Sequence, residues 1–193
     1  MTVPSDKHDF RVTTLSAEDV EMLFGQQQQL SLEGVTALSA EAAAALARHP
    51  GQIFLADLTT LEPEAARELA KHRGLTLAIG CDCAPEPEAL AALASHERVL
   101  VLEGLTTLSA EAARALSLHQ GMALSLRRLA AIEPDAAREL ARYRGTLNIN
   151  GLTTLSAEAA RAFGDFKGFA LTLYGLTSLD RKSTRLNSSH EWI

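Results

Sequence analysis

The sequence predicts an α/β protein, an open right-handed solenoid of strand-turn-helix units, with a parallel sheet on its concave face and short helices on its convex face. Three observations support this fold class. The same twelve letters stand at Gly104–Ala115 and at Gly151–Ala162. An acidic residue recurs every 23 or 24 residues, and the hydrophobic period changes inside each unit. Self-similarity at a fixed period of this length is typical of stacked repeats.

Each unit contains two apolar residues that are spaced by two, which places both side chains on one face of a strand. These pairs are Leu30 and Leu32, Ile53 and Leu55, Leu77 and Ile79, Leu100 and Leu102, Leu124 and Leu126, Leu147 and Ile149, and Leu171 and Leu173. Two more apolar residues follow in the turn, for example Leu105 and Leu108. We expect them to point into the same core.

A short helix is predicted after each turn. The recurring acids mark its first turn, and they are Glu18, Glu41, Glu64, Glu88, Glu111, Asp135 and Glu158. Ser or Glu-Pro stands ahead of each acid; Ser suits an N-cap and Pro suits the first helical position. A carboxylate there is favoured by the helix dipole by about 0.3–1 kcal/mol. Glycines after the helix, such as Gly74 and Gly121, predict a left-handed stop. Helices of about two to three turns need stacking to be stable.

At the strand and turn, the sequence resembles the leucine-rich repeat family, whose segment reads Leu-x-Leu-x-x-Asn-x-Leu. Leu147, Ile149, Leu152 and Leu155 carry the resemblance, which extends from Val12 to Leu179. It implies an Ala-rich, bacterial-type variant of that family. The chain departs from the family at the Asn position, where a buried amide ladder is absent. That position holds Gly34, Asp57, Gly104, Arg128, Gly151 and Gly175.

The domain organisation follows from where the repeat pattern begins and ends. Residues 1–11 are predicted to be a polar tail or a degraded repeat, and residues 12–179 about seven repeats plus a truncated eighth. Residues 180–193 switch to a polar composition and resemble a translated sequencing adapter, so we expect them to be non-native. The segment from Cys81 to Pro85 replaces the usual turn of the fourth unit, which predicts a local distortion.

Composition excludes several classes of partner. A formal net charge of -6 argues against nucleic acid and anionic membranes, which need clustered Lys and Arg. No stretch approaches the roughly 18 apolar residues of a membrane span, and the first residues lack the apolar core of a signal peptide. The cytoplasm is therefore the default expectation. Cys81 and Cys83 have no second pair and are expected to be free thiols.

Residues with catalytic or metal-binding chemistry fit structural roles better. His49, His72, His96 and His119 share one repeat position with Tyr143 and Phe166, and this exchange with aromatics predicts packing at the helix end. A metal is disfavoured because each layer would offer one ligand. Arg67, Arg114, Arg138 and Arg161 follow the acids by three residues, which predicts ion pairs along the helix. No phosphate loop or nucleophile motif is visible, so we expect no enzyme, cofactor or small-molecule substrate.

The remaining candidate site is the concave face, because strand residues between and after the inward pairs point there. The candidate binding residues are Phe54, Val101, Glu103, Arg127, Asn148, Asn150 and Tyr174, with Phe54, Val101 and Tyr174 as the exposed apolar or aromatic members. Solenoids use this surface for extended partners. The sequence favours a non-enzymatic interaction module that binds protein or peptide, as a fragment of a longer leucine-rich-repeat protein. Two alternatives stay open: a targeting or regulatory region of a larger enzyme, and a structural spacer.

Overall fold

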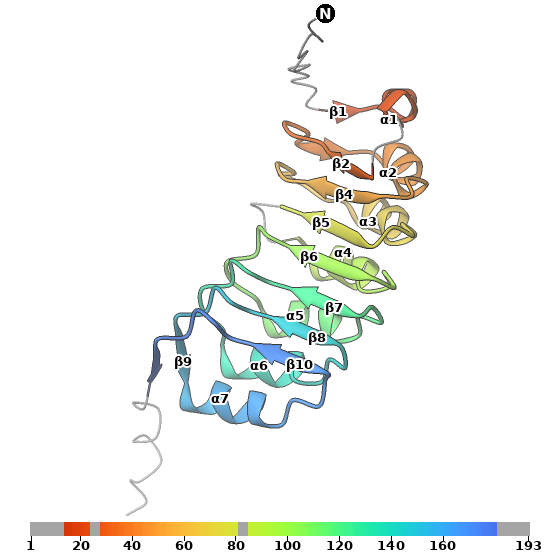
Figure 1. Ribbon diagram of the computed structural model, residues 1–193. Coiled ribbons are helices and arrows are strands. Elements are labelled where there is room, and N and C mark those ends of the chain that lie inside the picture. The colour runs from red at the N-terminus through yellow and green to blue at the C-terminus, as the bar shows by residue number, and fades with distance from the viewer. Residues whose placement is uncertain (1–13, 24–27, 81–84, 181–193) are drawn as a thin grey trace, which may run out of the picture.

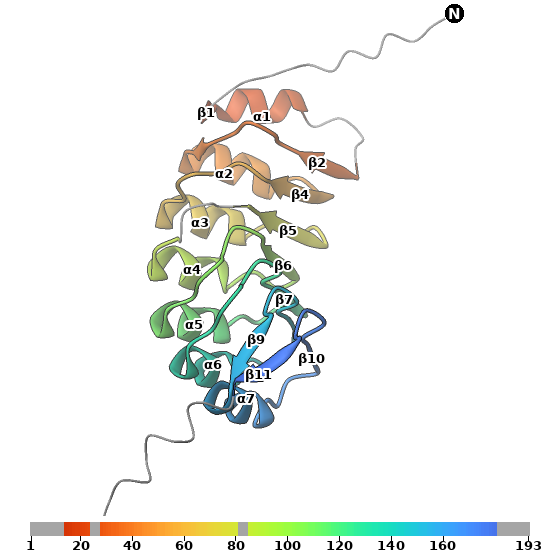
Figure 2. The ribbon, with the colours of Figure 1, turned by 90° about the vertical axis from the view of Figure 1, so that its left-hand side faces the viewer.

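The computed structural model describes residues 14–23, 28–80 and 85–180, and it is an α/β structure (Figure 1). Within these residues, a seven-stranded parallel sheet and seven helices form two layers, and the helices lie on one side of the sheet (Figures 1 and 2). The predicted α/β class with a parallel sheet is confirmed. Residues 1–13, the segment with Cys81 and Cys83, and residues 181–193 lie outside the described part of the chain.

The strands of the large sheet pair in chain order. They are β2 (Gln29–Ser31), β4 (Gln52–Leu55), β5 (Thr76–Ile79), β6 (Val99–Leu102), β7 (Ala123–Ser125), β8 (Thr146–Asn148) and β10 (Ala170–Thr172). The register aligns equivalent positions of successive units: Leu77 lies opposite both Ile53 and Leu100. Two short parallel pairs accompany the sheet, β1 (Thr14–Leu15) with β3 (Ala37–Leu38), and β9 (Thr154–Ser156) with β11 (Ser178–Asp180).

The helices have seven or eight residues, at the short end of the predicted length. They are α1 (Ala17–Leu23), α2 (Ala40–Ala47), α3 (Pro63–Ala70), α4 (Pro87–Leu93), α5 (Ala110–Ser117), α6 (Pro134–Leu140) and α7 (Ala157–Gly164). The predicted caps are confirmed. The Ser109 Oγ accepts a hydrogen bond of 3.1 Å from the Ala112 N–H, and proline opens α3, α4 and α6. The recurring acids lie in the first turns as expected.

The core lies between the sheet and the helices and is built from leucine and alanine. The predicted inward strand pairs from Leu30 to Ile149 are all buried, as are the turn residues Leu105 and Leu108. Each buried leucine contributes roughly 1.5–3 kcal/mol relative to an exposed one. Leu171 and Leu173 are only partly buried, because β10 is the last strand of the described sheet. None of the helices in the described ranges has the length and apolar content to cross a bilayer.

The predicted left-handed glycine stops after the helices are wrong. Among the described residues, only Gly34 has a positive φ, of 79°. The glycines after the helices serve close packing between layers. A Cβ on Gly74 would lie 1.9 Å from the Gly51 carbonyl oxygen, and a Cβ on Gly121 would lie 2.0 Å from that of Arg98. Glycine is needed there because the backbone of one layer almost touches the next.

Replacing Gly121 by alanine tests this explanation. We expect Gly121→Ala to lower the free energy of unfolding by about 1–3 kcal/mol, because the clash is with backbone that cannot turn aside. Urea denaturation would measure the change. Gly164→Ala is the matched control, since an added Cβ there meets nothing within 4 Å. It should leave stability unchanged or raise it by up to about 1 kcal/mol. Equal losses in both variants would contradict the close-approach explanation.

Candidate functional site

One face of the sheet lies opposite the helices (Figure 2), and the alternation of side chains along the strands assigns the predicted binding residues to it. We call this surface the strand face and define it by two rows. The first row is Ser31, Phe54, Ala78, Val101, Ser125, Asn148 and Thr172; the second is Glu33, Ala56, Gly80, Glu103, Arg127, Asn150 and Tyr174. The register places Phe54 beside Ala78 and Ser125 beside Asn148. At about 4.8 Å per strand, Phe54 and Asn148 stand about 19 Å apart.

The middle of the first row is closed to solvent, which corrects one prediction. Val101 was expected to be exposed, but only 8% of its surface is accessible. It lies on the outer face and outside the hydrophobic core, so neighbours on the sheet itself bury it. Ala78 and Ser125 flank it in register on both sides. Phe54 is half-buried, whereas Tyr174 is 86% exposed and is the open aromatic residue of the predicted set.

The two asparagines of the strand face connect successive layers. The Asn148 Oδ1 accepts a hydrogen bond from the Thr172 hydroxyl, and the Asn150 Oδ1 accepts one of 3.2 Å from the Tyr174 N–H. Both are half-buried. Their side-chain oxygens are therefore held in place, which preorganises the C-terminal part of the face. The spacing of 24 residues within each pair was visible in the sequence, but the bonds were not predicted.

Charge on the strand face is carried by side chains just beyond the strand ends. Glu103 follows β6 and Arg127 follows β7, and both are exposed. They occupy adjacent positions of the second row and carry opposite charges.

Ser125 lies in the first row but was not among the predicted binding residues. Its Oγ is buried and has no hydrogen-bond partner among the described residues. Such an unsatisfied hydroxyl costs about 1–3 kcal/mol.

A second distinctive feature lies inside the molecule, at the turns that follow the helices. His49, His72, His96 and His119 are all buried, and Tyr143 continues their line in the next layer. We call these five residues the imidazole row. The predicted packing at the helix end is confirmed. Ring centroids of His72 and His96 are 5.8 Å apart with planes inclined by 16°, and those of His119 and Tyr143 are 5.7 Å apart.

Each of the last four members of the imidazole row contacts a backbone carbonyl of the preceding layer. His72 Nε2 lies 2.9 Å from the Gly51 oxygen, His96 Nδ1 lies 3.4 Å from that of Ala70, and His119 Nδ1 lies 3.1 Å from that of Ala94. The Tyr143 hydroxyl donates to the Gly121 oxygen at 2.8 Å. The row therefore links layers through hydrogen bonds as well as packing. Within the described residues, no group of three or more His, Cys, Asp or Glu side chains is placed to hold a metal ion.

Burial keeps His72, His96, His119 and Tyr143 of the imidazole row neutral. It lowers the pKa of His72 and His119, and it lowers the pKa of His96 from 6.5 to about 4. The pKa of Tyr143 is raised to about 12 by the same loss of solvation. Because a charged imidazole or phenolate loses its hydration in the interior, these four side chains are uncharged at neutral pH.

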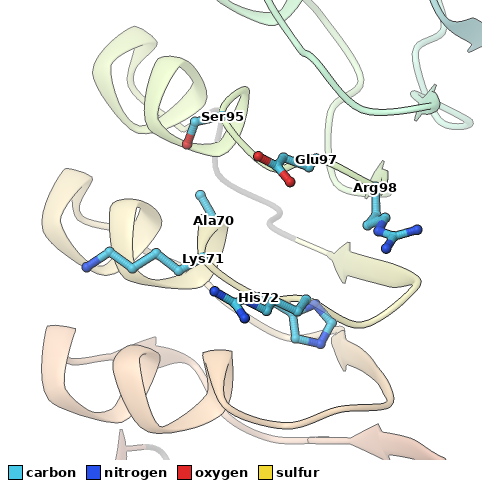
Figure 3. A pocket seen from close by; sticks show the side chains of 7 residues that line it. Ala70, Lys71, His72, Ser95, Glu97 and Arg98 are labelled. Carbon is cyan, nitrogen blue, oxygen red and sulfur yellow. The ribbon is translucent and has the colours of Figure 1, made fainter.

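Two clefts open beside the imidazole row. One, of about 450 Å³, is lined by Ala70, Lys71, His72 and Arg73 of one layer and by Ser95, Glu97 and Arg98 of the next (Figure 3). The other, of about 500 Å³, is lined by the turn at His49 together with Glu68, Lys71 and Arg73. Both contain charges of both signs, and Lys71 already pairs with Glu68 at 2.6 Å. The clefts therefore lack the uniform charge that would select an anion or a cation.

The ion pairs predicted along the convex helices are confirmed for Arg67 and Arg138. Arg67 pairs with Glu64 at 2.9 Å, and Arg138 pairs with Asp135, in both cases three residues apart on an exposed helix surface. Such pairs contribute about 0.2–0.5 kcal/mol each. Their main consequence is that this surface presents no unbalanced stripe of arginine at these positions.

No protein-family model matches the chain, and no curated protein matches its sequence. The relation to leucine-rich repeats therefore stays a prediction from the residue pattern.

The two tyrosines of the chain offer a direct test of the imidazole row. Tyr143→Phe removes the hydroxyl that bonds to the Gly121 oxygen, and we expect it to lower the free energy of unfolding by about 1–3 kcal/mol. Tyr174→Phe makes the same chemical change at an exposed site and should stay within about 0.5 kcal/mol of the wild type. Thermal unfolding would measure both. A loss of the same size in both variants would show that the buried bond contributes nothing specific.

Proposed function

We propose that the chain is a non-enzymatic protein-binding module, built as an open right-handed solenoid of the leucine-rich-repeat kind. The constant register between consecutive strands supports this proposal, as does the packing of each helix against the next. A parallel connection through a helix is right-handed in nearly all proteins. In such an array each unit contacts mainly its neighbours, which produces a long surface suited to an extended partner.

The observation that carries the proposed function is the strand face, whose first row is held in constant register and which no helix of the described residues covers. An extended segment of a partner protein would lie across the strands and meet one side chain of each row per layer. Tyr174 and Arg127 are the side chains best suited to dominate its binding energy, because aromatic residues and arginine are enriched among such residues. Glu103 and Asn150 would select the partner's polar groups beside them.

Burial narrows the proposed contact set. Val101 is excluded as a contact residue by its small accessible surface, so the apolar contribution would come from Phe54 and Tyr174 at different parts of the face. Asn148 already accepts a bond from Thr172 and would contact a partner only through its remaining donors. The proposal therefore centres on Arg127, Asn150 and Tyr174, near the C-terminal part of the described sheet.

Peptides selected from a displayed random library against the whole chain would test this function. We expect Arg127→Glu and Tyr174→Ala each to weaken binding of the selected peptides at least tenfold, about 1.4 kcal/mol, measured by fluorescence anisotropy. Arg114→Glu is the control, since Arg114 is also an exposed arginine and lies on α5, on the helix side of the sheet. Its peptide affinities should stay unchanged. Failure to select any peptide, or a greater loss at Arg114 than at Arg127, would refute the strand face as the binding surface.

A further inference from the structure

We propose that His72, His96 and His119 of the imidazole row form an acid-sensitive link between layers, which holds the helix-to-strand turns closed when these rings are neutral and releases the turns when the rings are protonated. This inference concerns the regulation of the fold and is independent of the proposed binding function. It rests on the hydrogen bonds of the ring nitrogens, on the charges around them and on the tyrosine that replaces histidine in one layer.

The two nitrogens of each ring differ in their hydrogen bonds. A carbonyl oxygen only accepts hydrogen bonds, so the nitrogen that faces it must carry the proton: Nε2 in His72, and Nδ1 in His96 and His119. The opposite nitrogens are buried and have no hydrogen-bond partner in the described part of the chain. A second proton on His96 would therefore create a buried cationic N–H with no acceptor, whereas backbone of His49 beside His72, and of Arg98 and Ala123 beside His119, offsets part of the lost hydration.

Other rings and mostly cationic side chains surround the histidines of the row. His72 faces the rings of His49 and His96, and the cleft beside it is lined by Lys71, Arg73, Glu97 and Arg98. His96 lies between His72 and His119 with Arg98 nearby, and all three act against a positive charge on it. His119 stacks on the uncharged Tyr143 and otherwise faces backbone of Arg98 and Ala123. Around His49 lie Arg48, Glu68, Lys71 and Arg73.

The balance of these groups disfavours imidazolium. Among the carboxylates near the row, Glu21 is paired with Arg48 and Glu68 with Lys71, which leaves Glu97 facing cations of two layers. A proton on one ring also raises the cost of a proton on its neighbour, because stacked rings are 5.8 Å apart. Protonation therefore favours a state in which the turns have opened and each ring reaches water.

The sign of the pH dependence follows from the direction of the pKa shifts. An unfolded histidine binds a proton near pH 6.5, whereas burial depresses the pKa of His72, His96 and His119 in the folded chain, to about 4 for His96. Above pH 6.5 these histidines are neutral in both the folded and the unfolded state, so a change of pH does not alter the stability through them. Between pH 6.5 and about 4 the unfolded state binds more protons, so stability falls as the pH falls. Each histidine lowers the folding equilibrium constant by up to about tenfold per pH unit.

The chain itself contains the acid-insensitive version of this link. Tyr143 occupies the same position, is fully buried, stacks on His119 and donates to the Gly121 oxygen. Its hydroxyl holds its proton across the whole range, since burial raises the pKa of Tyr143 to about 12. Tyrosine therefore preserves both the packing and the bond to the preceding layer while removing the titration.

The test compares the full chain with the triple variant His72→Tyr, His96→Tyr and His119→Tyr. Urea denaturation at pH 7.5 and at pH 5.0 would give the folding equilibrium constant. Both pH values lie above the ordinary range of carboxyl pKa values, so the carboxyl groups stay charged throughout. We expect the folding equilibrium constant of the wild type to fall at least a hundredfold from pH 7.5 to pH 5.0, and that of the variant to fall less than tenfold. Equal losses in both proteins, or no loss in the wild type, would overturn the proposal.

A second measurement covers the case in which the triple variant does not fold. NMR titration of the imidazole Cε1–H signals in the wild type should show that His72, His96 and His119 stay neutral in the folded state below pH 6.5, where a solvated imidazole becomes charged, with signals of an opened state growing below pH 6. If His72, His96 and His119 titrate near pH 6.5 while the fold stays intact, the proposal is wrong.

Discussion

The rest of the structure depends on the spacing that the parallel backbone ladder imposes between layers. Strands stack at about 4.8 Å, whereas a helix with its side chains is about 10–12 Å across. Alanine on the buried helix surfaces, as in α3 and α5, lets successive helices approach more closely than larger side chains would allow. The Ala-rich composition is thus a consequence of the sheet spacing, because larger side chains between the helices would force the layers apart.

The same spacing explains the turns after the helices. There the backbone of one layer comes so near the next that a Cβ on Gly74 or Gly121 would overlap a carbonyl oxygen. Beside these glycines, the imidazole row bonds to carbonyls of the layer below. Glycine and histidine are two parts of one contact: the first lets the backbones meet, and the second satisfies a carbonyl that helix or strand hydrogen bonds leave available. This interdependence makes the turn a sensitive point of the fold.

Much of the fold could be predicted because its signals are local. Period-two leucines, serine caps and Pro at the helix start each follow from the conformation of a few neighbouring residues, and repetition confirms them from unit to unit. The candidate site was harder to predict from the sequence. The alternation of side chains predicted that Val101 points outward from the sheet. Its burial, however, depends on its neighbours Ala78 and Ser125, which lie on two other strands. The bonds of Asn148 and Asn150 likewise join residues 24 positions apart.

The sequence by itself determined the period, the alternation of strand and helix, the caps and the residues that share each face, because these are set by backbone conformation over a few residues. Only the tertiary structure decided why the glycines are needed, which strand-face side chains are open to a partner, and which nitrogen of each buried histidine carries the proton. These depend on distances between layers, and such distances arise only when the strands have paired.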